Sequence, residues 1–117
     1  MNYSLLIHEP PEGFAARTDP ELQQAYWEGT MRYLQALREA GIFRGGAGLQ
    51  APSSATTLRY RDDKLQVQDG PYADTKDQLG GFFIIEVPNL DLALEWAWRF
   101  PRRPGVVVEV RPNLPQD

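Results

Sequence analysis

The sequence predicts an α+β fold in which two helices pack on one face of a four-stranded sheet. Short apolar segments that suit strands stand near both ends and in the second half of the chain. Two segments with helical spacing separate them, and Pro and Gly residues mark the turns between. A chain of 117 residues has the size of one domain, so we expect a single domain over residues 1–117.

The first third of the chain predicts one strand and one long helix. Residues 2–8 are rich in Leu and Ile and stop before a Pro-Pro pair, which indicates a strand. The segment Thr18-Asp19-Pro20-Glu21 has the residue types of a helix N-terminus, and Gly41 suits a helix end. Between them apolar residues recur at helical spacing. A second apolar stripe widens this face, either as more core or as an interface: Trp27, Met31 and Leu34.

The middle of the chain predicts a weak strand and a hairpin. Residues 43–49 suit a strand poorly, because glycines leave little side chain to pack and favour a bulge or a close backbone approach. Residues 56–60 and 65–68 flank the charged turn Arg61-Asp62-Asp63-Lys64. This arrangement predicts a polar β-hairpin inserted between the weak strand and the next strand.

The last third predicts a strand, a helix and a final strand. Residues 82–87 form the most strand-like segment of the chain. Asn89 is a suitable N-cap for a helix that runs past Trp96 and stops before Pro101, and residues 106–111 alternate like a strand. The whole order is therefore that of a ferredoxin-like βαββαβ fold with an inserted hairpin.

Strand alternation predicts how the sheet is covered. Each strand has one wholly apolar face, which suits the helices, and one mixed face. The mixed face carries four side chains that are too apolar to remain in water: Leu6, Phe82, Ile84 and Val107. A second copy of the chain is the simplest cover, so we expect a homodimer of the dimeric α+β barrel type.

Polar residues on the mixed face form the first candidate site. His8 is the only histidine and hence the only imidazole base. If the two central strands ran parallel, Glu86 would lie near His8 at one end of the sheet. Arg111 shares this face and suits an anionic ligand, while Phe82 would supply an apolar wall. The alternatives are a structural hydrogen bond for His8 and an ion pair between subunits.

The segment before residue 82 forms the second candidate site. Asp69 opens a turn at Gly70 and Pro71 and suits either a hydrogen bond to its own turn or ligand binding. With parallel central strands, Asp69 would lie roughly 20 Å from His8. Lys76 is a loop charge with a ligand-binding interpretation, and Gly80 and Gly81 are expected to allow close packing where the strand begins.

Composition excludes several classes of function. The chain has no cysteine, which removes disulfides and thiolate chemistry, and no spacing of His, Asp and Glu suggests a metal site or a cofactor. A net charge of −4 argues against nucleic-acid binding, and the group Arg99, Arg102 and Arg103 suits a solvated loop. No apolar segment approaches the ~20 residues of a membrane span, and no signal peptide is evident. We expect a cytoplasmic protein.

The segment Asp69-Gly70-Pro71-Tyr72, with Lys76 and Gln78-Leu79-Gly80-Gly81-Phe82 after it, resembles the YCII-related family, in the branch named for its DGPF motif. Tyr72 replaces the usual Phe. Further likeness covers most of the chain, at Tyr3-Ser4-Leu5-Leu6-Ile7, Ala40-Gly41-Ile42, Gly48-Leu49-Gln50, Ala93-Leu94-Glu95-Trp96-Ala97 and Val108-Glu109-Val110-Arg111-Pro112. The resemblance implies the fold and a link to extracytoplasmic-function sigma factors, but no particular reaction.

Two functional hypotheses follow. Relatives proposed to be catalytic resemble one another in a His on the first helix, paired with an Asp, whereas residues 27–33 of this chain contain no His. This difference favours a dimeric ligand-binding or regulatory module associated with sigma-factor-dependent transcription over an enzyme. The alternative is a cofactor-free isomerase or lyase that uses His8 as general base, Glu86 as its orienting group and Arg111 as the anchor of an anionic substrate.

Overall fold

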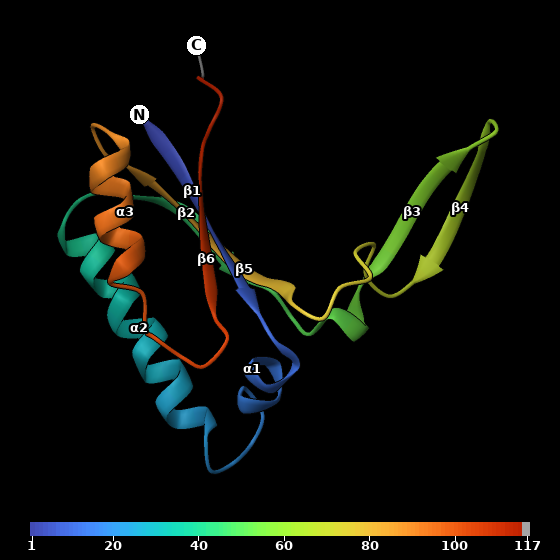
Figure 1. The fold of residues 1–117 in the computed structure, drawn as a ribbon, viewed down its shortest axis with the longest axis horizontal. Helices are drawn as coiled ribbons and strands as arrows, with labels where there is room; N and C mark the ends of the chain where they lie inside the picture. The colour runs from blue at the N-terminus through green and yellow to red at the C-terminus, as the bar shows by residue number, and fades with distance from the viewer. Residues whose placement is uncertain (116–117) are drawn as a thin grey trace.

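A computed structural model of the chain, which describes residues 1–115, shows a body of helices and sheet with a hairpin projecting from it (Figure 1). The elements are, in chain order, β1 (Asn2–Glu9), α1 (Pro11–Ala16), α2 (Gln23–Glu39), β2 (Phe43–Gly48), a short 3₁₀ turn (Pro52–Ser54), β3 (Thr56–Arg61), β4 (Lys64–Asp69), β5 (Gln78–Glu86), α3 (Leu90–Trp98) and β6 (Val107–Pro112). The predicted α+β, ferredoxin-like arrangement is confirmed.

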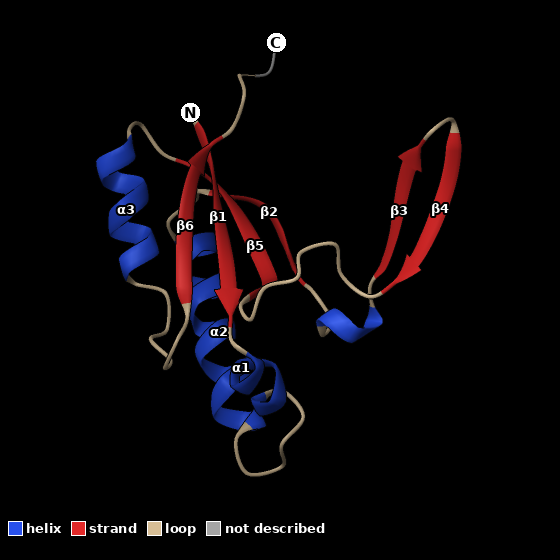
Figure 2. Cartoon of the chain, turned by 45° about the vertical axis from the view of Figure 1, so that its right-hand side comes forward, coloured by secondary structure: helices blue, strands red, loops and turns tan. Residues whose placement is uncertain are grey.

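The sheet of the body has the strand order β2-β5-β1-β6, and every neighbouring pair is antiparallel. Helices α2 and α3 lie on the same side of it (Figures 1 and 2). The assumption of parallel central strands is therefore wrong for β1 and β5. The crossover through α2 makes β2 parallel to β1, and β5 enters between these two strands in the opposite direction.

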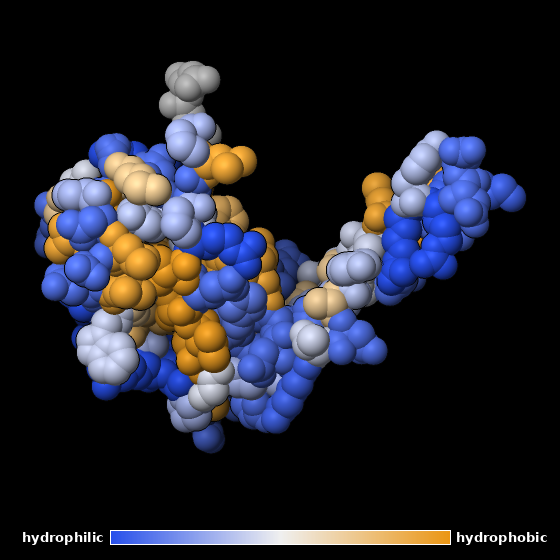
Figure 3. Space-filling view, turned by 45° about the horizontal axis from the view of Figure 1, so that its top comes forward, coloured by the Kyte–Doolittle hydropathy of each residue, from blue (hydrophilic) through white to orange (hydrophobic). Residues whose placement is uncertain are grey.

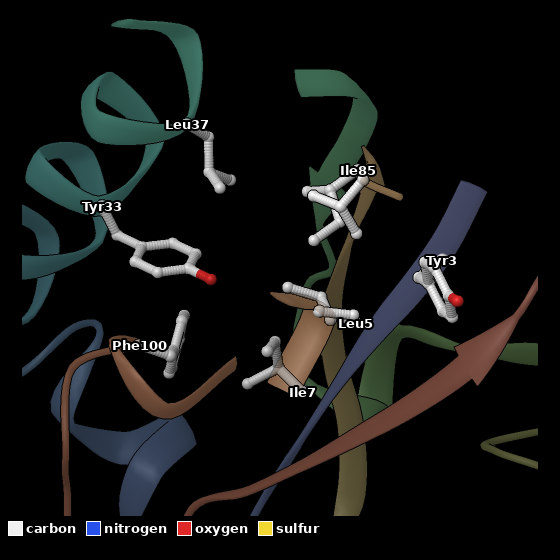
Figure 4. Close-up of a cluster of buried hydrophobic side chains, with 9 residues drawn as sticks. Tyr3, Leu5, Ile7, Tyr33, Leu37, Ile85 and Phe100 are labelled. Carbon is white, nitrogen blue, oxygen red and sulfur yellow. The ribbon is translucent and has the colours of Figure 1, made fainter. Parts of the chain in front are cut away.

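The hydrophobic core lies between the sheet and the two helices. Leu5 of β1, Leu37 of α2 and Ile85 of β5 are completely buried and point toward one another (Figure 4). Tyr33 packs among them, and its hydroxyl donates a hydrogen bond of 2.6 Å to the backbone carbonyl of Trp96 in α3. The strand residues in and against this core alternate along each strand, as one apolar face per strand requires: Tyr3, Leu5 and Ile7 of β1, Phe83 and Ile85 of β5, and Val108 and Val110 of β6.

Helix ends were predicted with mixed success. Asn89 caps α3, because its side-chain oxygen accepts a 3.0 Å hydrogen bond from the Leu92 amide, and Gly41 ends α2 with a φ of 71°. However, α2 begins at Gln23 without a side-chain cap, and α1 was not predicted. Asp19 instead accepts a 2.8 Å bond from the Glu21 amide in a separate turn.

Strands β3 and β4 form an arm that stands away from the body, joined to it only by chain segments at its base (Figures 1 and 2). The predicted turn is confirmed: Asp62 and Asp63 both have positive φ angles, of 52° and 60°. The prediction of a polar hairpin is wrong for one of its faces. Leu58 pairs with Val67 and Tyr60 with Leu65 there, and all four side chains are exposed.

Candidate functional site

A buried carboxylate lies where β1 meets the helices. Glu9 is the last residue of β1, and its side chain is completely buried. Arg17, just after α1, approaches one carboxylate oxygen at 3.1 Å, and Arg103, before β6, approaches the other at 2.8 Å. The Tyr26 hydroxyl of α2 lies 2.8 and 2.9 Å from the two oxygens. Buried carboxylates need such partners, because desolvation penalises an unpaired charge heavily.

The two arginines connect this carboxylate to most of the body. Arg17 donates to the Tyr26 hydroxyl at 3.0 Å, to the Gly80 carbonyl at 2.8 Å and to the Leu49 carbonyl. Arg103 donates to the Thr30 hydroxyl at 2.6 Å and to the Tyr26 carbonyl at 3.3 Å. We call Glu9, Arg17, Tyr26, Thr30 and Arg103 the Glu9 network.

The Glu9 network carries an excess of positive charge. It holds two guanidinium groups, which remain protonated in proteins, and one carboxylate. Tyr26 adds no negative charge, because burial, followed by its hydrogen bond to Glu9, raises the pKa of its hydroxyl above the ordinary value. The Arg17 guanidinium also lies near the rings of Phe14 and Trp27, at 4.8 and 5.8 Å from their centroids. Within the Glu9 network, the guanidinium groups therefore outnumber the carboxylate by two to one.

A cavity of about 240 Å³ opens beside the Glu9 network, between α2 and the strands β2 and β5. Arg17, Tyr26 and Thr30 lie at one part of its wall, and Arg38 is exposed at another. The rest of the wall is mainly apolar and includes Trp27, Met31, Leu34, Phe43, Phe83 and Phe100. The second apolar stripe of α2 thus lines a cavity. An apolar concavity with a few polar groups is the usual form of a small-molecule site.

The prediction that Glu86 lies near His8 is wrong. His8 pairs with Leu79 at one end of the sheet, whereas Glu86 pairs with Asn2 at the other. Glu86 instead lies 3.5 Å from Arg44 of β2. The cause is the antiparallel direction of β1 and β5, which puts residues late in both strands at opposite ends.

Glu109 of β6 takes the place that was predicted for Glu86. Its carboxylate lies 3.0 Å from His8 Nε2 and also accepts a hydrogen bond from Arg111. The bond from Arg111, and then that from His8, lowers the pKa of the Glu109 carboxyl. This group occupies the face of the sheet opposite the helices, as strand parity predicted for His8 and Arg111, and is separate from the cavity.

The remaining predicted site residues are distributed over the body and the arm. Phe82 borders the cavity, but it pairs with Leu6 and so belongs to the face of the sheet opposite the helices. Asp69 and Lys76 are exposed at the base of the arm. Within residues 1–115, the side-chain hydrogen bond at this turn comes from the Thr57 hydroxyl, which donates to the Gly70 carbonyl at 2.8 Å, and not from Asp69, contrary to the Asx interpretation. The turn is held by Gly70, with a φ of 97° and a 2.7 Å bond from its amide to the Ala55 carbonyl.

The sequence contained one signal for the Glu9 network. A Cβ atom on Gly80 would lie 2.7 Å from Arg17 Nη2 and 3.0 Å from Glu9 Oε2. The first glycine of the Gly-Gly pair therefore leaves the space in which this ion pair forms. The solvated-loop interpretation of the arginine group is wrong for Arg103, which reaches Glu9 from 94 positions away in the chain.

The model of the YCII-related domain matches residues 1–114. The chain belongs to the YCII-related family. This YCII-related protein is also 42% identical, over 74 residues, to an uncharacterized protein of Rhizobium meliloti (strain 1021). That match covers 60% of each of the two chains, so the YCII-related protein spans less than two thirds of the relative's length.

Across residues 1–115, no three His, Asp or Glu side chains gather closely enough to suggest a metal site. The helices of the same range include none that is long and apolar enough to cross a membrane. The cavity wall contributes arginine, hydroxyl and aromatic groups. Arginine forms strong, often bidentate hydrogen bonds with carboxylates.

Proposed function

We propose that this YCII-related protein is a small cytoplasmic ligand-binding or regulatory module that acts as a homodimer. The cavity beside the Glu9 network is the observation that supports the proposal most directly. Its ligand has a flat apolar body and one anionic group. The aromatic wall suits the body of such a ligand, and the positive charge of Arg17 and Arg38 in the same wall suits its head group.

The size and polarity of the cavity limit the ligand. A cavity of about 150 Å³ is large enough for benzene. A volume of about 240 Å³ therefore admits a small aromatic acid. Most donors of Arg17 are used by Glu9, Tyr26 and two carbonyls. Arg38 makes no ion pair with any described residue, and its guanidinium carbon lies 5.4 Å from the centroid of the Phe43 ring. We therefore assign the anionic group of the ligand to Arg38.

Binding is tested with phenylacetate and its uncharged analogue phenylacetamide. We expect phenylacetate to shift the NMR signal of the Trp27 indole N–H, because Trp27 lines the cavity. Replacing Arg38 by Ala should weaken binding of phenylacetate about tenfold, the effect of a hydrogen bond to a charged group, and should leave phenylacetamide unchanged. Calorimetry measures both affinities.

Arg32→Ala is the matched control, because Arg32 is exposed on the same helix and does not line the cavity. Equal losses in the two variants would show that the effect is general electrostatics. A Trp27 signal that neither compound moves at millimolar concentration would contradict the cavity as a site for aromatic acids.

The homodimer is supported by the face of the sheet opposite the helices. Leu6, Phe82 and Ile84 are only half-buried there, and Val107 is 51% exposed. Light scattering at low micromolar concentration should give the mass of a dimer that buries at least ~1,200 Å². Ile84→Glu should produce a monomer or an aggregate, because it buries an unpaired charge, whereas Ala25→Glu on exposed α2 should remain dimeric. A monomeric wild-type protein would contradict the proposal.

The link to an extracytoplasmic-function sigma factor rests on the likeness to the DGPF branch. This link concerns the biological context of the protein and does not identify residues that would contact a sigma factor. A sigma-factor gene beside the gene for this protein would support the link, and a catabolic operon would favour an enzyme instead.

The second candidate function is the cofactor-free isomerase or lyase. The observation in its favour is the 3.0 Å contact between His8 and Glu109, since a base held by a carboxylate is a common catalytic arrangement. In this version Glu109 orients His8 and Arg111 anchors the substrate. Turnover that is lost in His8→Ala, with the fold intact, would favour this candidate over the binding module.

A further inference from the structure

The β3–β4 arm has one apolar and one polar face. The apolar face carries Leu58, Tyr60, Leu65 and Val67, which are 61%, 74%, 63% and 66% exposed. The polar face pairs Arg59 with Gln66 and Arg61 with Lys64. An isolated two-stranded hairpin is marginally stable in water unless its apolar face is covered. The sequence of the arm therefore suits a hairpin that is packed against another surface.

The arm also makes the chain far less compact than a monomer of its mass. The radius of gyration is 16.0 Å, whereas a compact domain of this length has about 13.4 Å. The accessible surface is 8189 Å², whereas a monomer of 13.3 kDa exposes about 6,450 Å². The excess of about 1,700 Å² is roughly twice the area that each partner contributes to a standard interface. Such an excess is typical of a chain whose surface is completed by a partner.

The shape of the chain indicates where that partner lies. The arm rises on the side of the sheet that the helices leave open, with a wide space between arm and body (Figures 1 and 3). Apolar atoms of the arm appear on its side toward the body, while most of its remaining surface is hydrophilic (Figure 3). Two apolar surfaces, the open face of the sheet and the apolar face of the arm, thus border the same space.

We propose that the arm clasps a second copy of this chain, whose body enters the space between the arm and the open face of the sheet. The inference rests on the proposed homodimer and adds a second contact region to it. Two-fold symmetry lets each arm cover the body of the other chain, so both apolar surfaces of both chains are covered in one closed assembly. A different protein would need surfaces that match both the open face of the sheet and the apolar face of the arm. A second copy of the chain carries both of these surfaces and has the same excess of accessible surface to cover.

The test compares two lysine substitutions on neighbouring residues of β4. Leu65→Lys places a charge on the apolar face of the arm, and Gln66→Lys places the same charge on the polar face. Sedimentation over a range of concentrations gives the dissociation constant of the dimer. We expect Leu65→Lys to raise it at least tenfold and Gln66→Lys to change it less than threefold. A dimeric wild type with an unchanged constant in Leu65→Lys would overturn the arm contact and leave the dimer standing.

A crosslinking experiment tests the contact between the arm and the second chain even if Leu65→Lys unfolds the arm. The chain has no cysteine, so Leu65→Cys can be labelled at one position with a benzophenone maleimide. Irradiation should give a covalent dimer, and no such product from a dimeric sample would overturn the proposal. A monomeric wild type, with the arm free to bind some other protein, would overturn both the dimer and the clasp.

Discussion

Glu9→Ala is expected to lower the free energy of unfolding by about 3–5 kcal/mol, the usual loss when one partner of a buried ion pair is removed. Two guanidinium groups, of Arg17 and Arg103, would then share a buried region without the carboxylate that both contact. The Tyr26 hydroxyl would lose its acceptor as well. Urea denaturation followed by circular dichroism measures the change.

Glu12→Ala is the control, because it removes the same charged group from an exposed position in α1. Its effect should stay within about 0.5 kcal/mol, as for most surface substitutions. Similar small effects of both substitutions would contradict the role of Glu9 as the centre of the network. A stable Glu9→Ala protein that binds phenylacetate more tightly would instead show that the arginines are free to serve a ligand.

Gly80→Val is expected to be nearly as destabilising, by about 3 kcal/mol or more, because it breaks the same ion pair from the opposite side. The first added carbon would lie 2.7 Å from Arg17 Nη2 and 3.0 Å from Glu9 Oε2, so Arg17 cannot withdraw without giving up its ion pair with Glu9 and its hydrogen bonds to Tyr26 and the Gly80 carbonyl. The melting temperature should fall by more than 10 °C, since about 1 kcal/mol corresponds to roughly 4–8 °C in a domain of this size.

Gly48→Val is the matched control for Gly80→Val. Gly48 is exposed near the end of β2, and a Cβ atom there would meet no atom within 4 Å. Valine also suits a strand, so the control should be neutral or slightly stabilising. If the two variants melt at the same temperature, the space beside Gly80 is not what the Glu9 network requires.

The face that each strand residue occupies could be predicted from the sequence, since alternation along a strand is a local property. Leu5 and Ile85 point to the helices, and His8 and Arg111 point away, as parity requires. The pairing of His8 could not be predicted in the same way. That pairing depends on the relative direction of β1 and β5. A long stretch of chain, which includes the inserted hairpin, separates these two strands in the sequence, so their direction is not a local property. An assumption about that direction placed Glu86 where Glu109 lies.

The sequence by itself determined the strands, the two main helices, the inserted hairpin and the apolar side of the sheet, because each depends on spacing or on turn residues close together in the chain. Only the tertiary structure decided the candidate site. Glu9, Arg17 and Arg103 come from segments up to 94 positions apart, and none has a local pattern that distinguishes it from a surface charge. Their burial is a consequence of how the end of β1 meets α2 and the segment before β6. A charged side chain is buried only where the packing of these elements brings an oppositely charged partner next to it.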